Sequence, residues 1–207
     1  MNYLRDENML EIENDLVKRG YNLIAGVDEA GRGPLAGSVF AAAVILPPGL
    51  VIEGINDSKK LSPKKREELF DIITKSALAY SIASIDNFVI DEINILNATY
   101  KAMARAIEGL SITPDYVIID GNSAKGILLP HECVVKGDAK SQSIAAASIL
   151  AKVARDRQMI EYDRLYPQYN FKKHKGYGTK EHIQNIIKYG PCPIHRRSFL
   201  KNIIEIA

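Results

Sequence analysis

Three short apolar segments of the chain each lead into acidic side chains, and this pattern limits the possible folds more than any other feature of the sequence. The segments span residues 23–27, 116–119 and 133–135. Their length and their β-branched residues are typical of buried strands. The acids at or just beyond their carboxyl ends are Asp28, Glu29, Asp120 and Asp138. If the strands lie side by side and parallel, these carboxylates gather at one edge of a sheet, where open α/β sheets hold their functional sites.

The remaining segments complete an α/β pattern. Residues 39–46 and 79–85 indicate two further strands. Helices are expected from Ser62 and Pro63 to residue 77, from a cap at Asp91 to Gly109, and from Ser141 to about residue 162. After Pro167 the sequence predicts loops and one more helix. Strands that alternate with helices in this way predict a sheet covered by helices.

A cluster of carboxylates predicts a metal site. Like charges crowded at one sheet edge repel one another unless cations neutralise them, and oxygen ligands select hard ions such as Mg²⁺ or Mn²⁺. Two such ions, about 4 Å apart, activate a water and stabilise the leaving oxygen of a phosphodiester. Any one of the acids taken alone is explained as well by capping a helix or a turn. The hypothesis of nuclease chemistry therefore depends on their coincidence.

The loop Gly31-Arg32-Gly33-Pro34 follows the first acidic pair. Two glycines allow the backbone to approach a ligand, and an arginine binds phosphate with two donors, so the loop suits a sugar-phosphate chain. A tight turn would explain the glycines but not the arginine. The spacing of Gly31, Gly33 and Ala36, with Glu53 further on, also fits a dinucleotide-binding fingerprint. That fingerprint must open a helix, whereas residues 39–46 indicate a strand, so we reject this alternative.

The formal net charge of +2 conceals a basic C-terminal part. Between residues 172 and 201 there is one acid, Glu181, against the basic residues Lys172, Lys173, Lys175, Lys180, Lys188, Arg196, Arg197 and Lys201. This segment is a candidate phosphate-binding surface, although a charged segment is more often a solvated face.

The composition indicates a cytoplasmic protein. No segment approaches the roughly 18 apolar residues that span a bilayer, and the first residues are too polar for a secretory signal. The two cysteines, Cys133 and Cys192, are far apart in the sequence and are expected to be free thiols.

Several separated motifs together resemble the ribonuclease HII family. They are residues 26–37 (GVDEAGRGPLAG), 57–61 (DSKKL), 119–121 (IDG), 136–140 (KGDAK), 143–156 (SIAAASILAKVARD) and 174–179 (HKGYGT). They occur in order over nearly the whole chain, so the probability that the similarity arose by chance is very small.

This resemblance implies a ribonuclease H-like fold, a mixed five-stranded sheet flanked by helices, with a helical C-terminal extension. It implies that Asp28, Glu29, Asp120 and Asp138 are the catalytic carboxylates that bind Mn²⁺ or Mg²⁺. It also implies that Gly31, Arg32 and Gly33 sense the 2′-hydroxyl and that Tyr177 stacks on the sugar at an RNA–DNA junction. The implied reaction is hydrolysis on the 5′ side of a ribonucleotide in RNA–DNA hybrids or in ribonucleotide-containing duplex DNA, which leaves 3′-hydroxyl and 5′-phosphate ends.

Other residues are weaker candidates. Lys59, Lys60 and Ser141 are expected to hold neighbouring phosphates, although the lysines are as well explained by solvation and Ser141 by capping its helix. Asp156 lies between two arginines and fits a charge network on a helix better than a fifth metal ligand. The histidines and Cys192 have no spacing typical of zinc sites. The sequence does not decide whether His195, Arg196 and Arg197 touch substrate or pack locally.

We expect an N-terminal accessory segment at 1–20, a catalytic core at 21–165 and a basic substrate-binding extension at 166–207, in a monomer without an obligate protein partner. Two alternatives remain. A ribonuclease HIII-like enzyme usually carries an additional N-terminal domain, and about 20 residues precede the first core strand here. A catalytically silent nucleic-acid binder would not need to keep all four acids.

Overall fold

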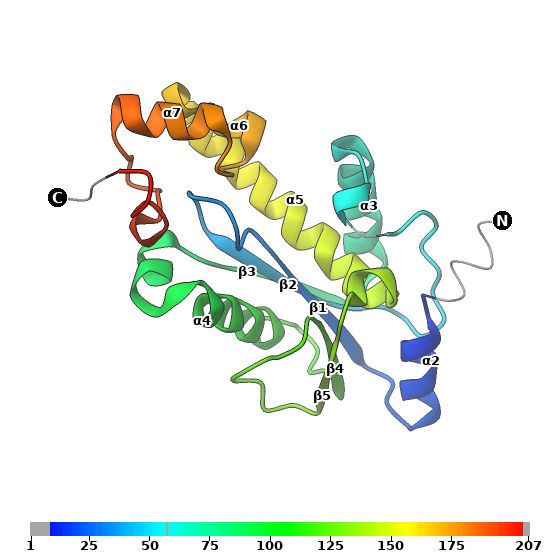
Figure 1. The fold of residues 1–207 in the computed structure, drawn as a ribbon. Coiled ribbons are helices and arrows are strands. Elements are labelled where there is room, and N and C mark those ends of the chain that lie inside the picture. Colours follow the sequence, from blue (N-terminus) through cyan, green and yellow to red (C-terminus); the bar gives the residue numbers. More distant parts are fainter. Residues whose placement is uncertain (1–8, 57, 205–207) are drawn as a thin grey trace.

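A computed structural model of the chain describes residues 9–56 and 58–204. Five strands form one mixed sheet in the order β3-β2-β1-β4-β5 (Figure 1). Their bounds are β1 Ile24–Ala30, β2 Val39–Ile45, β3 Ala79–Ile85, β4 Tyr116–Asp120 and β5 His131–Val134. The α-helices are α2 Glu11–Lys18, α3 Pro63–Ser76, α4 Asn87–Glu108, α5 Gln142–Leu165, α6 Phe171–His174 and α7 Lys180–Tyr189. The 3₁₀ turns are η1 Ser58–Lys60, η2 Gly137–Ala139, η3 Pro167–Tyr169 and η4 Arg197–Phe199. The predicted fold class is confirmed.

The three strands that carry acids are neighbours and run in the same direction. β1 is parallel to β4 and β4 is parallel to β5, whereas β2 is antiparallel to both β1 and β3. β1 is longer than predicted, since its pairing with β2 continues to Ala30 opposite Phe40. Asp28 and Glu29 therefore lie inside β1, near its carboxyl end, rather than after it. As consecutive strand residues, they direct their side chains to opposite faces of the sheet.

Each face of the sheet has its own apolar core. On one face α3 and α5 pack against β2 through buried residues that include Leu69, Ile73 and Ile149. On the other face α4 packs against β1, β2 and β3 through residues such as Ile90 and Met103, in a core that also includes Val117 of β4. Figure 1 shows α5 and α4 on opposite sides of the sheet. This double covering explains why the strands have continuous apolar sequences.

Helix α5 runs along β1 at very close range. A Cβ atom added to Gly26 would lie 2.1 Å from the backbone of Ser143, and one added to Gly31 would lie 2.1 Å from Nε of Arg155. Gly31 also has φ +97, which disfavours any side chain. The approach needs glycine on the strand side and small residues on the helix, which accounts for the serines and alanines of α5.

The prediction that Asp91 caps the second helix is wrong. The cap of α4 lies five residues earlier, at Asp86, whose side chain accepts a hydrogen bond from the amide of Val89. The helix is interrupted at Asn94 (φ 66, ψ 164), whose side chain accepts from the amide of Asn97 and restarts it. The carboxylate of Asp91 instead accepts hydrogen bonds from residues of the C-terminal segment, the Arg197 amide and the Ser198 amide and hydroxyl.

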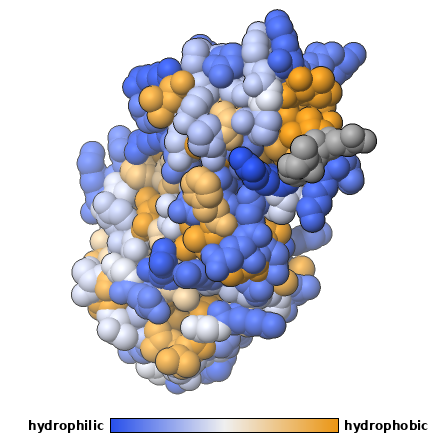
Figure 2. Space-filling view, turned by 90° about the vertical axis from the view of Figure 1, so that its left-hand side faces the viewer, coloured by the Kyte–Doolittle hydropathy of each residue, from blue (hydrophilic) through white to orange (hydrophobic). Residues whose placement is uncertain are grey.

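The C-terminal segment has a small apolar cluster of its own. Tyr169, Phe171 and Ile186 are buried together with Met159 from α5. Figure 2 shows that the outer face on this side of the molecule is largely hydrophilic with separate apolar patches, and α7 exposes Ile187 at 63%. None of the helices in the described ranges is long and apolar enough to cross a membrane.

Candidate active site

Adjacent parallel strands place Asp28 and Asp120 side by side. In the register of β1 and β4, Val27 is paired with Ile119, so the next residues along the two strands are these aspartates. An oxygen of Asp120 accepts a 2.6 Å hydrogen bond from the amide of Gly137. This bond holds η2, and with it the buried Asp138, against the end of β4. The fold therefore places Asp28 next to Asp120 at this sheet edge, with Asp138 in the turn that is tied to Asp120.

The acids are buried or half-buried, so water screens the repulsion between their negative charges only weakly. Burial raises the pKa of Asp28 well above its ordinary value, and the neighbouring charges of Glu29 and Asp120 raise it further. Burial also raises the pKa of Glu29, against the opposing effect of Arg32, whose Nη1 lies 3.4 Å from a Glu29 oxygen. The ionised form of these carboxylates is therefore unfavourable in the absence of a cation. A bound cation would stabilise it.

The donor set fits a hard divalent cation. Its members are carboxylates only, which are the ligands that Mg²⁺ and Mn²⁺ prefer. Within residues 9–56 and 58–204, no group of three or more Asp, Glu, His or Cys side chains is positioned to hold a metal ion. The fit to a cation therefore rests on the chemistry of the acids and on the adjacency of Asp28 and Asp120, not on a preformed cage.

A cavity of about 170 Å³ is lined by one of the acids, Glu29, and by most of the predicted substrate-binding residues. Its wall contains Glu29, Gly31, Arg32, Gly33, Lys59 and Tyr177, together with Ala30, Ser58, Ser148 and Lys152. Glu29, the glycine loop and Tyr177, which are up to 148 positions apart by residue number (29 to 177), thus line one cavity.

Tyr177 lies over the glycine loop. A Cβ atom added to Gly33 would be 3.7 Å from the tyrosine ring, which is an ordinary contact distance. The ring is 44% exposed, and its centroid lies 5.8 Å from the guanidinium carbon of Arg155. The ring is therefore held beside Arg155 by the protein, and its exposed part is accessible to a ligand.

Two weaker candidates do not line this cavity. Lys60 is exposed in η1. Ser141 is fully buried, accepts a hydrogen bond from the Ile144 amide as the cap of α5, and donates its hydroxyl to Glu13. The hydroxyl of Ser141 therefore serves as the cap of α5, which is the alternative that the sequence offered, and its contact with a substrate phosphate stays a prediction.

Ser148 and Lys152 were not predicted. The hydroxyl of Ser148 lies 2.9 Å from that of Ser58 in η1, and Ser148 is also a hydrogen-bond partner of Asp28. Lys152 is anchored by Asp156, with Nζ 2.6 Å from Oδ1. The signal in the sequence was a polar stripe at positions 148, 152 and 156, spaced by four residues along α5.

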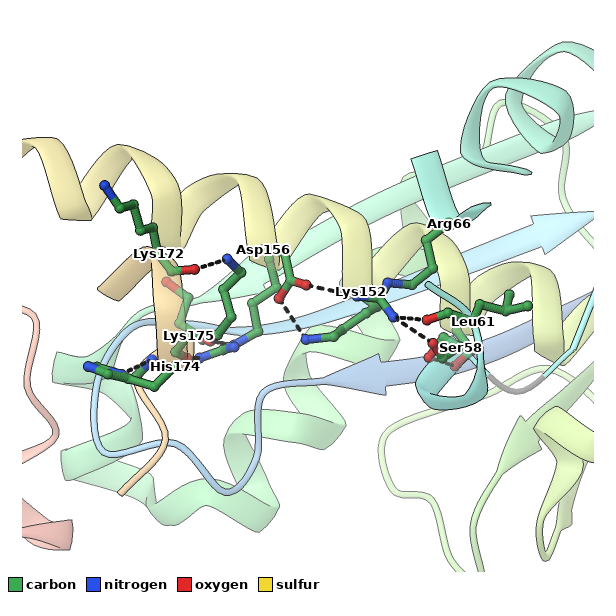
Figure 3. Close-up of polar contacts among 12 residues, drawn as sticks. Ser58, Leu61, Arg66, Lys152, Asp156, Lys172, His174 and Lys175 are labelled. Carbon is green, nitrogen blue, oxygen red and sulfur yellow. Dashed lines mark hydrogen bonds and ion pairs between the residues drawn. The ribbon is translucent and has the colours of Figure 1, made fainter. Parts of the chain in front are cut away.

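The network around Asp156 continues to η1. Figure 3 shows Lys152 and Arg66 both directed at Asp156. Arg66 donates to the carbonyl oxygens of Ser58 at 2.9 Å and Leu61 at 2.7 Å. The interpretation of Asp156 as a member of a charge network agrees with these contacts, and the network holds the lysine-bearing turn beside the cavity.

The histidines of the C-terminal segment pack internally. His182 and His195 have ring nitrogens 3.1 Å apart, and burial lowers the pKa of each to about 4. The thiol of Cys192 lies 3.1 Å from His195, and burial raises its pKa to about 11. His195 and Arg196 are buried, whereas Arg197 is exposed. The question left open by the sequence is resolved for the first two, which pack locally.

Comparison with known proteins identifies relatives over the full length of this chain. A family model described as ribonuclease HII matches residues 25–202. The ribonuclease HII of Caldicellulosiruptor saccharolyticus is 61% identical over 200 residues, which cover 97% of this chain and 98% of that protein. The ribonuclease HII of Clostridioides difficile is 56% identical over 207 residues. This match covers 98% of this chain and 81% of that protein.

Solved structures have the same fold. The ribonuclease H2 of Pyrococcus horikoshii superposes with a TM-score of 0.72 at 28% identity, over 87% of this chain and 96% of that one. The ribonuclease HII in a complex with PCNA from Archaeoglobus fulgidus gives a TM-score of 0.68 at 25% identity, over 84% of this chain and 94% of that one. With the matching family model and these identities, the chain belongs to the ribonuclease HII family of metal-dependent nucleases, which hydrolyse RNA paired with DNA.

Proposed function

We propose that this protein incises duplexes on the 5′ side of a ribonucleotide by two-metal-ion catalysis, both in RNA–DNA hybrids and at single ribonucleotides embedded in DNA. The observation that carries the proposal is that Asp28 and Asp120 directly follow the paired residues Val27 and Ile119 on adjacent parallel strands, while Glu29 lines a cavity with the glycine loop and Tyr177. The acids would supply the ligands of the cations, and the glycine loop and Tyr177 would recognise the sugar.

The proposed ligands of Mg²⁺ or Mn²⁺ are Asp28, Glu29, Asp120 and Asp138. When bound, the two ions would supply an activated water and stabilise the charge of the leaving 3′-oxygen. The carboxylates themselves hold fixed positions: the Asp28 oxygen accepts from the Glu29 amide at 2.6 Å, and Asp120 is tied to Gly137. No side chain needs to act as a nucleophile.

Discrimination between RNA and DNA is assigned to the loop and the tyrosine. The 2′-hydroxyl is the only backbone group that distinguishes a ribonucleotide, and metal ions bound to phosphate do not read it. Gly31, Arg32 and Gly33 offer backbone donors on one wall of the cavity, while the partly exposed ring of Tyr177 offers a surface on which a sugar can pack.

The neighbouring phosphates are assigned to basic residues around the cavity. Lys59 lines it directly, and Lys60 follows in the same exposed turn. We propose that the extension at 166–207 acts with the core at 21–165 by supplying Tyr177 and exposed lysines such as Lys180. The segment 1–20 is proposed to be a separate accessory part, of which residues 1–8 lie outside the described ranges. We also propose that the protein acts as a monomer, which sedimentation at working concentration would test.

The experiment is cleavage of a DNA duplex that contains one ribonucleotide, with Mg²⁺, Mn²⁺ or EDTA. We expect metal-dependent incision 5′ to the ribonucleotide and a loss of about a hundredfold or more in Asp120→Asn, as for other groups at a reacting centre. Asp71→Asn is the matched control, because Asp71 is exposed on α3. Cleavage of long hybrids without incision at the single ribonucleotide would favour the ribonuclease HIII-like alternative, and binding without cleavage of either would favour a silent binder.

A further inference from the structure

Arg196 is a fully buried residue whose guanidinium group, within the described residues, donates to backbone carbonyls of the glycine loop and of Gly37 just after it. Its Nη2 donates to the carbonyl of Gly31 at 2.6 Å, its Nη1 to those of Arg32 and Pro34 at 2.9 Å each, and its Nε to that of Gly37 at 2.9 Å. The side chain is 0% exposed. A residue from the basic end of the chain is therefore enclosed by the loop and has no surface for a phosphate.

These four bonds fix the direction of the loop amides. In a trans peptide unit the carbonyl of one residue and the N–H of the next point in opposite directions. Since the carbonyls of Gly31 and Arg32 point inward at the guanidinium, the N–H groups of Arg32 and Gly33 point outward. In the described ranges, neither of these two amides donates a hydrogen bond within the protein, and both residues line the cavity.

A second buried arginine holds the other end of the same loop. Arg155 on α5 donates to the carbonyls of Ala36 and Ser38 at 3.3 Å each and to that of Lys175 at 2.9 Å. Over the described ranges, neither Arg155 nor Arg196 forms an ion pair with a carboxylate. Two desolvated guanidinium groups beneath the loop thus have the loop carbonyls as partners, and their positive charge lies behind amides that face the ligand.

The segment that carries Arg196 is itself held in place. Asn87 at the start of α4 donates to the carbonyls of Pro193 at 2.9 Å and His195 at 3.2 Å. Ala36 in the loop pairs with His195 as an isolated β-bridge, and the Arg196 amide donates to the carbonyl of Leu35. The C-terminal segment and the loop therefore form one unit rather than a loop with a mobile tail.

We propose that Arg196 is a positioning residue for ribose selectivity: by holding the carbonyls of Gly31 and Arg32 inward, it presents the amides of Arg32 and Gly33 to the 2′-hydroxyl. Lysine cannot replace it, since one ammonium group cannot reach four carbonyls that surround a planar guanidinium. The inference rests on the proposed function, in which the glycine loop reads the sugar.

The test measures selectivity separately from overall binding. In an Asp120→Asn background, which is expected not to cut, the dissociation constants are measured for two duplexes that differ in one 2′-hydroxyl. We expect a preference of about tenfold for the ribonucleotide duplex, which corresponds to about 1.4 kcal/mol. Arg196→Lys should reduce the preference to about twofold or less and leave the dissociation constant of the all-DNA duplex unchanged. Arg197→Lys, which alters the exposed neighbour, should keep the preference.

Each other outcome contradicts a stated idea. If the background protein itself shows no preference, the proposed sugar recognition fails and the role of Arg196 fails with it. If Arg196→Lys is folded and keeps the full preference, or weakens binding to both duplexes equally, the arginine has only a structural role and the inference alone fails. If Arg196→Lys does not fold, Asn87→Ala takes its place, because it removes two bonds behind the segment and leaves Arg196 intact; an unchanged preference in that variant also overturns the inference.

Discussion

The carboxylate of Glu13 on α2 accepts a 2.6 Å hydrogen bond from the hydroxyl of Ser141, the residue that caps α5 128 positions later. The same oxygen accepts from the amide of Ser143 at 3.0 Å. An acidic side chain at the amino end of a helix satisfies free amides and interacts favourably with the helix dipole. The N-terminal segment, whose role was not predictable from the sequence, thus stabilises the start of the helix that packs along β1.

Glu13→Ala should therefore destabilise the protein. We expect a loss of about 1–3 kcal/mol in the free energy of unfolding, because two buried donors lose their acceptor. Urea denaturation at neutral pH measures it. Glu11→Ala on the exposed side of the same helix is the control and should change the free energy by less than about 0.5 kcal/mol. Equal effects of the two substitutions would show that the cap contributes nothing.

Metal removal should affect the wild-type protein and the Asp28→Asn variant differently. The buried charges of Asp28 and its neighbours oppose one another, so Mg²⁺ should stabilise the wild-type protein, by about 2.7 kcal/mol at a hundredfold excess over its dissociation constant. Asp28→Asn should lose this response and should be at least as stable as the wild type in EDTA. Thermal unfolding with Mg²⁺ and with EDTA measures both effects. A wild-type midpoint that does not respond to Mg²⁺ or Mn²⁺ would contradict the proposed ligand set.

Stability should decrease in mild acid because of the buried histidines. His182 and His195 have pKa values of about 4 in the folded protein, below the ordinary value of 6.5. The unfolded chain therefore binds more protons than the folded one between these values, so the stability present above pH 6.5 is lost as the pH falls toward 4. Urea denaturation between pH 7 and 4.5 measures this slope. His182→Gln should make it shallower and His131→Gln, at an exposed position, should not; equal slopes in both variants would exclude the buried pair as its source.

The sequence was sufficient to predict the sheet edge that carries the acids. Short β-branched segments followed by acids identified β1, β4 and β5, and the parallel pairing of Val27 with Ile119 confirms why their carboxyl ends meet. The residues that cap the helices were harder to predict, because several residues near the start of a helix can act as its N-terminal cap. Asp91 was a reasonable cap by residue type, but Asp86 lies before the first turn, and only the fold reveals that Asp91 binds the C-terminal segment instead.

The roles of the two buried arginines were not predictable for a physical reason. Arginine in a basic segment has the same sequence signature whether it faces solvent or backbone carbonyls. Arg196 and Arg197 are neighbours, yet the first is 0% exposed and the second is exposed. The distinction depends on where the loop at 31–37 folds back over the chain, which is a long-range contact that neither periodicity nor local composition encodes.

Lys152 should contribute to substrate binding as a phosphate contact. Lys152 lines the cavity that Glu29 also lines, and its ammonium group donates to Asp156 at 2.6 Å. Lys152→Met keeps most of the side-chain volume and removes the charge. If the ammonium neutralises one phosphate, the plot of log affinity against log salt concentration should lose about one unit of slope, and affinity should fall to a similar degree for ribonucleotide and all-DNA duplexes. Lys101→Met, an exposed change on α4 across the sheet, is the control. A weaker affinity with an unchanged salt slope would instead assign Lys152 to the network that supports Ser58 and the turn at η1, because a structural contact releases no counterion from the duplex.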